Sequence, residues 1–189
     1  MASRGGAHVS GTDGNDYLHR EKVAGQYAVS ATNKSRLKGL VFVHYLLGAA
    51  HLVRLLPSLI PLMGVSVILP LPPTPLPSPV EYAWLLSLPF TLLAMSACRR
   101  SKSGQLQVFQ LVLLLACVIP VIVTIYNLSS DIINLLTGGS TKDVDLLLGY
   151  PFPLVWSALL LLCLLVHIAE ICVTRTLVQA WAPRHGKRQ

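Results

Sequence analysis

Four long apolar runs dominate this sequence and constrain what the chain can fold into. At 1.5 Å of helical rise per residue, each run spans roughly 25 to 32 Å, close to the ~27–30 Å hydrocarbon core of a bilayer, so each can cross it. We therefore predict an all-α, polytopic membrane protein with four transmembrane helices. The runs are Leu37–Val53, Tyr82–Cys98, Leu106–Tyr126 and Leu154–Val173.

Composition supports a membrane protein over a soluble one. Charged residues make up 12% of the chain and hydrophobic residues 53%, whereas a soluble domain carries about 25% charge. The four cysteines all lie in or at the ends of apolar runs, which predicts packing roles rather than disulfides. In a soluble protein, a net charge of +7 would suggest binding to nucleic acid. Here the excess of Lys and Arg is explained by the orientation of the helices in the membrane, and we expect no nucleic-acid partner.

The distribution of Lys and Arg predicts that both termini are cytosolic. Six of them lie at or before Lys38, three lie in the loop 99–105, and four lie after the fourth run, whereas the other two loops hold only Arg54 and Lys142. Thirteen against two is a strong positive-inside bias. The predicted division of the chain follows from it: 1–36 cytosolic polar head, 37–57 first span, 58–81 luminal apolar and Pro-rich loop, 82–98 second span, 99–105 cytosolic basic loop, 106–126 third span, 127–153 luminal loop, 154–173 fourth span, 174–189 cytosolic basic tail.

Two parts of this division need comment. In the head, the sequence from Asp16 predicts a short helix at the membrane surface, with Asp16 as its N-cap. Residues 55–71 are nearly apolar enough for a fifth span, which would spoil the charge pattern. We expect the first helix to break at Pro57 or Pro61, with an interfacial or re-entrant stretch after it and Arg54 snorkelling to the outer face.

Ionisable residues inside the apolar runs are candidate functional groups, because burying them in lipid is costly. His44 and His51 share a face of the first run, and His167 and Glu170 share a face of the fourth. If the helices bundle, this candidate intramembrane cluster of His44, His51, His167 and Glu170 could meet in one interior. Three interpretations remain open: polar contacts between helices, transport or ion coupling, and catalysis, with Glu170 alternatively snorkelling or pairing with Arg175.

Motifs for chemistry are missing from the sequence. There is no HExxH, no GxSxG around Ser87 and no mid-span aspartate. We therefore predict no catalytic, cofactor-binding or metal-binding residues, and no enzymatic activity.

Three blocks resemble the Jagunal family. The opening, MASRGG followed by GTDGNDYLHREKVAGQYAVS and LKGLVFVH, is the most specific of them. EYAWLLSLP (Glu81–Pro89) and LLVHIAEICVTRTLVQAW (Leu164–Trp181) follow in the same order. The resemblance implies a four-span endoplasmic reticulum (ER) membrane protein with both termini cytosolic. It also implies roles in ER organisation, vesicle-mediated transport and maturation of secretory glycoproteins, and tails that engage the COPI coat.

The family's tails resemble dilysine retrieval signals, which the COPI coat binds, and the tail APRHGKRQ is a degenerate form of this signal. Lys187 is third from the end, where the signal needs a lysine, but His185 replaces the second lysine. Since histidine is mostly uncharged at cytosolic pH, we expect weak retrieval, depending on His185, Lys187 and Arg188. The tail could instead be a basic stub facing the membrane.

Together, the residues and the resemblance predict a non-enzymatic, multi-pass ER membrane protein. Its expected partners are the lipid bilayer, the COPI coat and secretory cargo, and a homo-oligomer is left open. The alternative is a small oligomeric transporter or channel that uses the intramembrane His and Glu residues.

Overall fold

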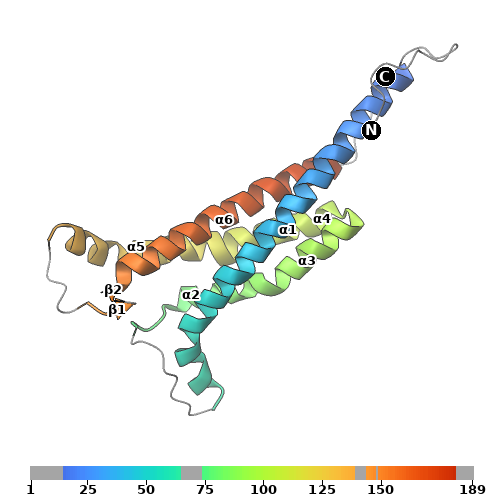
Figure 1. The fold of residues 1–189 in the computed structure, drawn as a ribbon. Coiled ribbons are helices and arrows are strands. Elements are labelled where there is room, and N and C mark those ends of the chain that lie inside the picture. The colour runs from blue at the N-terminus through green and yellow to red at the C-terminus, as the bar shows by residue number, and fades with distance from the viewer. Residues whose placement is uncertain (1–14, 65–73, 139–143, 148, 182–189) are drawn as a thin grey trace.

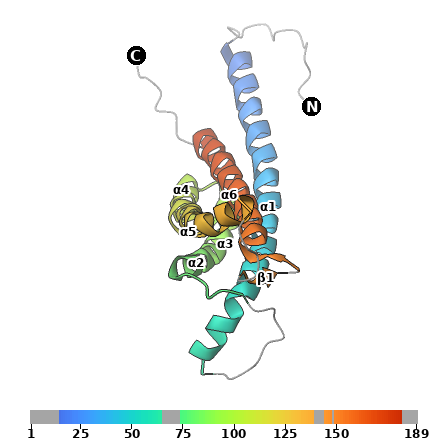
Figure 2. The ribbon, with the colours of Figure 1, turned by 90° about the vertical axis from the view of Figure 1, so that its left-hand side faces the viewer.

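The structure is a computed structural model that describes residues 15–64, 74–138, 144–147 and 149–181. The prediction of four transmembrane helices is confirmed: four helical segments are long and apolar enough to cross a membrane. They form one elongated bundle (Figures 1 and 2). Residues 65–71 of the apolar stretch, and the candidate tail residues His185, Lys187 and Arg188, lie outside the described residues.

The first segment, α1 (Asn15–Leu62), is a single helix of 48 residues. At 1.5 Å per residue it is roughly 72 Å long, well beyond the ~40–45 Å of a whole bilayer. The predicted head helix is therefore not a separate element, because it begins at Asn15 and continues into the span. Alanine, lysine, arginine and leucine in this stretch are good helix formers, and no proline interrupts them before Pro57.

Of the two predicted break points, Pro57 is wrong, because α1 continues through it, whereas α1 ends at Leu62, one residue after Pro61. Each proline removes one backbone hydrogen bond, which membrane helices tolerate by bending. Figures 1 and 2 show α1 changing direction in its last turns. The helix ends at Leu62, and in the turn that follows it Gly64 has a φ of +73°, which is readily reached only by glycine.

The second segment joins α2 (Pro79–Ala83), a 3₁₀ turn η1 (Trp84–Leu86) and α3 (Ser87–Arg100). At its start the Glu81 carboxylate accepts a 2.9 Å hydrogen bond from the Ser78 backbone N–H, as in a capping box. At its end Ser101 adopts a left-handed conformation with φ of 50°. This tight turn leads directly to the third segment.

The third segment joins α4 (Ser103–Val112), a π-helical turn η2 (Leu113–Val118) and α5 (Ile119–Leu136). The π turn ends just before Pro120, which has no N–H to donate and whose ring would clash with the carbonyl four residues earlier. The extra residue of a π turn relieves that clash. The helix continues to Leu136, through part of what the sequence suggested was a loop.

The fourth segment, α6 (Phe152–Trp181), follows a two-residue antiparallel hairpin of β1 (Leu146–Leu147) and β2 (Tyr150–Pro151). Leu146 pairs with Pro151 and Leu147 with Tyr150. The hairpin turn contains Gly149, with φ of +82°. The core of the bundle lies where α6 packs against α1, α4, η2 and α5, around Phe109, Leu113 and Leu160.

One end of the bundle brings together the N-terminal half of α1, the α3–α4 turn and the end of α6. The Lys34 Nζ donates to Ser101 Oγ at 3.1 Å, and the Trp181 indole N–H donates to Ser30 Oγ at 2.9 Å. The Lys34 ammonium also lies 5.1 Å from the Trp181 ring centroid. Beyond these contacts, the first turns of α1 project away from the other helices (Figure 2).

Candidate functional site

Three of the predicted intramembrane residues meet in the bundle interior. His44 of α1 and His167 and Glu170 of α6 are each 0% exposed. Glu170 Oε2 lies 3.0 Å from His44 Nδ1 and 3.4 Å from His167 Nδ1. The seven-residue and three-residue spacings seen in the sequence place these groups on the facing sides of the two helices. Glu170 is thus fully buried and does not snorkel, contrary to that interpretation.

Two further members come from the junction of η1 and α3 and were missed by sequence reasoning. The Trp84 indole N–H donates to His167 Nε2 at 2.7 Å, and Ser87 Oγ lies 2.9 Å from His44 Nε2. The Ser87 hydroxyl also donates to the Trp84 carbonyl at 2.6 Å. Their three-residue spacing within EYAWLLSLP was an available signal, because it places both on one helical face.

The hydrogen-bond partners define where the protons lie. Because an indole N–H can only donate, His167 Nε2 must accept, and a neutral His167 carries its proton on Nδ1, facing Glu170. Because the Ser87 hydroxyl donates to Trp84, His44 Nε2 must donate to Ser87. One proton is then left between His44 Nδ1 and Glu170 Oε2. The two groups form either an ion pair or a carboxylic acid bonded to a neutral imidazole, and both are neutral overall.

Ser87, His44 and Glu170 have the connectivity of a serine hydrolase triad, but their surroundings do not suit hydrolysis. All three are 0% exposed, so a substrate has no route to the hydroxyl in this conformation. The hydroxyl is also committed to the Trp84 carbonyl. A triad acts together with an oxyanion hole, and here the nearby indole N–H is occupied by His167.

The same surroundings weaken a metal interpretation. Ligand atoms of His44, Cys117 and His167 lie within 4.8 Å of one another, and these residue types suit Zn²⁺. Each nitrogen of both histidines is already hydrogen-bonded, however, and His167 Nε2 faces a donor that cannot share its lone pair. These contacts fit polar packing between helices better than metal binding.

His51 belongs to a second polar cluster, nearer the other end of the bundle. Its Nε2 lies 2.9 Å from the Glu81 carbonyl oxygen, to which it donates. The Trp84 ring connects the two clusters, with centroids 5.4 Å from His44 and 4.8 Å from His51. The four predicted residues therefore divide into a group of three and a separate His51, joined by a tryptophan.

Arg54 does not snorkel, as the sequence suggested, but is 7% exposed in this second cluster. Its Nε donates to Glu81 Oε2 at 2.9 Å, and its Nη1 donates to the Pro75 carbonyl at 3.2 Å. The guanidinium also lies 4.6 Å from the ring centroid of Phe152 and 4.8 Å from that of Trp156. A carboxylate and two aromatic faces replace the water that a snorkelling arginine would seek.

Nearer the Trp181 end, a third contact joins α4 to α6. The Gln110 amide donates to Thr174 Oγ1 at 3.0 Å. Gln107, which shares its helical face by sequence spacing, is exposed. Apart from the bonds of His167 to Glu170, Ser87 to Trp84 and Arg54 to Pro75, these contacts link different helices, so polar residues hold the bundle together along its length.

Comparison with known proteins agrees with the sequence resemblance. A family described as "Jagunal, ER re-organisation during oogenesis" matches residues 1–185. Protein jagunal of Drosophila melanogaster is 33% identical over 100% of this chain and 99% of its own length, as is that of Drosophila pseudoobscura pseudoobscura. Human protein jagunal homolog 1 is 26% identical over 96% of this chain and 94% of its own length. With its whole length matched and four membrane-spanning helices in its structure, this chain belongs to the Jagunal family.

Proposed function

We propose that this protein is a non-enzymatic scaffold of the ER membrane that acts through contacts on its cytosolic side. In this role it organises the ER and supports vesicle-mediated transport and maturation of secretory glycoproteins in the early secretory pathway. The family's association with ER re-organisation supports the general role. The observation that carries the proposal is α1, a single helix that begins at Asn15, outside the bundle, and continues without interruption into it (Figure 2).

The contacts at the base of this extension favour a rigid arm. Trp181 and Ser101 hold Ser30 and Lys34, so the helix leaves the bundle in a defined direction. The polar network of His44, Glu170 and Trp84 fixes the same helix inside the membrane. Because α1 is held both by the polar network in the bundle and by the contacts of Ser30 and Lys34, a partner bound near its N-terminus would be held at a fixed position relative to the bilayer. Lys22, Arg36 and Lys38 are exposed on it, which suits anionic lipid headgroups or acidic partners.

The rigid arm is tested by breaking it without touching the membrane bundle. Ala28 is exposed in α1, and proline there costs about 3 kcal/mol of helix stability. In cells lacking the protein, we expect Ala28→Pro to be inserted at normal abundance but to leave ER morphology uncorrected. Ala28→Ser is the matched control and should restore it. Full restoration by Ala28→Pro would contradict a function that depends on a continuous arm.

COPI contact is the finer part of the proposal and depends on the tail. We expect Lys187→Ala combined with Arg188→Ala to shift a tagged protein from the ER towards the Golgi or cell surface. Arg184→Ala, in the same tail but outside the signal positions, is the control. Retention of the double variant in the ER would exclude the tail as the retrieval device. Loss of location with Arg184→Ala as well would indicate a general requirement for basic charge.

One observation favours the transporter as a second candidate. Glu170 Oε1 is buried and has no hydrogen-bond partner among the described residues, although Oε2 shares a proton with His44. Such an oxygen could receive a proton in transit. Reconstituted protein should then show a proton or ion flux that Glu170→Gln abolishes while abundance and location stay normal. No flux in the unmodified protein, or an equal flux in Glu170→Gln, would exclude this candidate.

A further inference from the structure

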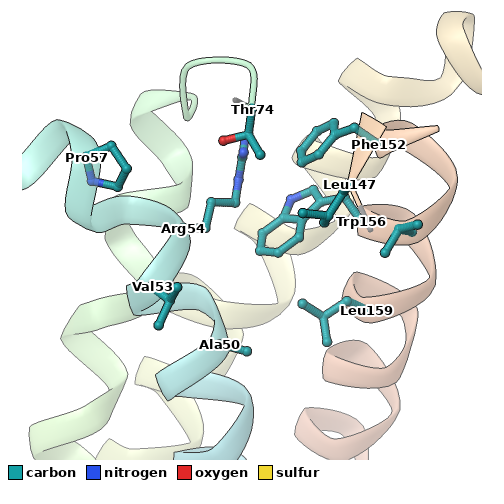
Figure 3. A pocket seen from close by; sticks show the side chains of 10 residues that line it. Ala50, Val53, Arg54, Pro57, Thr74, Leu147, Phe152, Trp156 and Leu159 are labelled. Carbon is teal, nitrogen blue, oxygen red and sulfur yellow. The ribbon is translucent and has the colours of Figure 1, made fainter. Parts of the chain in front are cut away.

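Hollows of similar volume lie at the two ends of the bundle and differ in chemistry. The groove between α1 and α6 near Arg54 has a volume of about 390 Å³, and its depth is apolar: Figure 3 shows Ala50, Val53 and Leu159 along it. The hollow at the other end has a volume of about 400 Å³ and is lined mainly by polar side chains. This second one, the Trp181 hollow, lies where the start of α1 diverges from the end of α6 (Figure 2).

One face of α1 forms a wall of the Trp181 hollow. The polar residues of this wall are Gln26, Tyr27, Ser30 and Lys34. Ser30 and Lys34 are four residues apart and therefore neighbours on the helix surface. Ser101, in the tight turn between α3 and α4, and Trp181, at the end of α6, also line the hollow. All of these residues are at least partly exposed, so a ligand can reach them.

Three polar groups of the hollow can donate more hydrogen bonds than the described residues accept. The Lys34 ammonium has three N–H groups, and one of them donates to Ser101 Oγ at 3.1 Å. Ser30 Oγ accepts from the Trp181 indole at 2.9 Å. Within the described residues neither serine hydroxyl donates to another group, and no carboxylate pairs with Lys34. An acceptor-rich ligand could therefore receive hydrogen bonds from all three side chains.

Positive charge surrounds the Trp181 hollow. Nine Lys and Arg residues but one acidic residue, Glu21, occur in the described segments at this end, which are 20–38, 99–105 and 174–181. Such a field favours an anion. A phosphate monoester carries a charge of about −1.5 to −2 near neutral pH and offers three strong acceptor oxygens. It therefore matches both the surrounding charge and the three donating side chains.

The level of the hollow relative to the bilayer favours a phosphate that stands above the membrane surface. Ser30 lies seven residues before Leu37, where the first apolar run begins, so it is roughly 10 Å further out along α1. The headgroup layer on each side of a bilayer is about 5–8 Å thick, which is half the difference between the whole bilayer and its hydrocarbon core. The phosphodiester common to phospholipids lies inside that layer, whereas a second phosphate, carried on the headgroup, reaches beyond it.

We propose that the Trp181 hollow binds a phosphate monoester on a lipid headgroup, as in a phosphoinositide monophosphate, with Lys34, Ser30 and Ser101 donating to its oxygens. The positive-inside bias places this end of the bundle at the cytosolic leaflet. Such binding goes beyond the scaffold role and does not require it. It also differs from a general attraction of exposed Lys and Arg residues to anionic lipid, because one hollow takes one headgroup.

The location of the site is tested on purified full-length protein in detergent micelles by native mass spectrometry, with dioctanoyl phosphatidylinositol 4-phosphate as the probe. We expect saturable binding of a single lipid. Ala180→Trp adds a ring to a residue that lines the hollow and should lower the affinity at least about tenfold. Gln179→Trp adds the same ring to the neighbouring exposed residue, which does not line it, and should leave the affinity unchanged. Equal affinities of these two variants would overturn the site.

The charge of Lys34 is tested separately from the shape of the hollow. Lys34→Gln keeps an N–H donor but loses the ammonium, and should weaken binding about tenfold, because hydrogen bonds to charged groups are the stronger ones. Lys34→Arg keeps the charge and should retain binding. Arg36→Gln removes the same charge from the opposite face of α1 and should weaken binding less than about twofold. Equal losses in Lys34→Gln and Arg36→Gln would indicate only general attraction to anionic lipid and would contradict the proposal.

Competition identifies the ligand class. Dioctanoyl phosphatidylinositol, which lacks the monoester, and dioctanoyl phosphatidylserine should bind at least about tenfold more weakly than the probe, and equal binding of either would exclude a monoester site. Inositol 1,4-bisphosphate carries the same phosphates without the lipid and should compete poorly, because the micelle raises the effective concentration of a lipid. Displacement by inositol 1,4-bisphosphate at the concentration of the probe would assign the hollow to a soluble phosphate instead, and displacement by a polyglutamate peptide would assign it to an acidic protein partner.

Discussion

The pair of His44 and Glu170 offers the most decisive test of how the bundle is held together. Replacing Glu170 by alanine leaves the Nδ1 groups of His44 and His167 without their acceptor, at sites that are 0% exposed. Each unsatisfied buried group costs about 1–3 kcal/mol, so Glu170→Ala should lower the free energy of unfolding by about 2–6 kcal/mol. His44→Ala removes the opposite partner, and the double variant completes a thermodynamic cycle.

The coupling energy of this cycle distinguishes two kinds of contact. Ordinary hydrogen bonds between membrane helices average about 0.6 kcal/mol and reach about 1.7 kcal/mol. A shared proton in a water-free interior, with a carboxylate and an imidazole 3.0 Å apart, should couple more strongly. We therefore expect at least about 2 kcal/mol, within the range of close charge pairs.

Unfolding of the purified protein can be followed by tryptophan fluorescence in mixed micelles with increasing SDS, since Trp84 lies in the network. Gln107→Ala, at an exposed polar site on α4, is the control and should change stability by less than about 0.5 kcal/mol. Glu170→Gln keeps one acceptor oxygen and should give an intermediate loss. A coupling energy of about 1.7 kcal/mol or less, the range of ordinary interhelical hydrogen bonds, would refute the shared-proton argument, as would single variants no less stable than the control.

Three further predictions follow from packing and burial. Gly48→Leu should destabilise the protein by about 1–3 kcal/mol in the same assay, because even a Cβ there would lie 3.0 Å from Leu88 Cδ2. Gly39→Leu is the control and should not destabilise the protein, because no atom lies within 4 Å of a Cβ at that position. Arg54→Ala should cost about 3–5 kcal/mol, because it leaves the buried Glu81 carboxylate without its cation; Arg54→Ala with Glu81→Gln should recover part of that loss. A small maleimide should label Cys172 in the folded protein and the three buried cysteines only after denaturation, as read by intact mass.

Much of the fold could be predicted from the sequence, because long apolar runs have few ways to satisfy their backbone groups in lipid. Each such run must form its own hydrogen bonds, so its length and hydropathy are enough to predict a helix. Helix ends are harder to predict, because they depend on contacts distant in the chain. Pro57 and Pro61 suggested a break, yet α1 continues through Pro57 and ends only at Leu62, with Arg54 held nearby by Glu81 and two aromatic rings.

The candidate site likewise has a part that could be predicted from the sequence and a part that could not. The ionisable residues His44, His167 and Glu170 could be selected from the sequence alone, because such groups in apolar runs are costly unless they are paired. Their partners could not be selected, since Trp84 and Ser87 are ordinary residues for a membrane helix. Only the rotation and height of α2–α3 against α1 and α6 bring the indole N–H and the hydroxyl to the histidine nitrogens.

The sequence by itself thus determined the number of membrane-spanning helices and the polar residues that need partners, because hydropathy and residue spacing are properties of single segments. Its resemblance to known sequences determined the protein's family. Tertiary structure decided which nitrogen meets which oxygen, and why Arg54 is buried rather than at the surface. It also decided that an apolar groove lies between α1 and α6. These properties depend on the relative placement of segments that are far apart in the chain, and hydropathy says nothing about that placement.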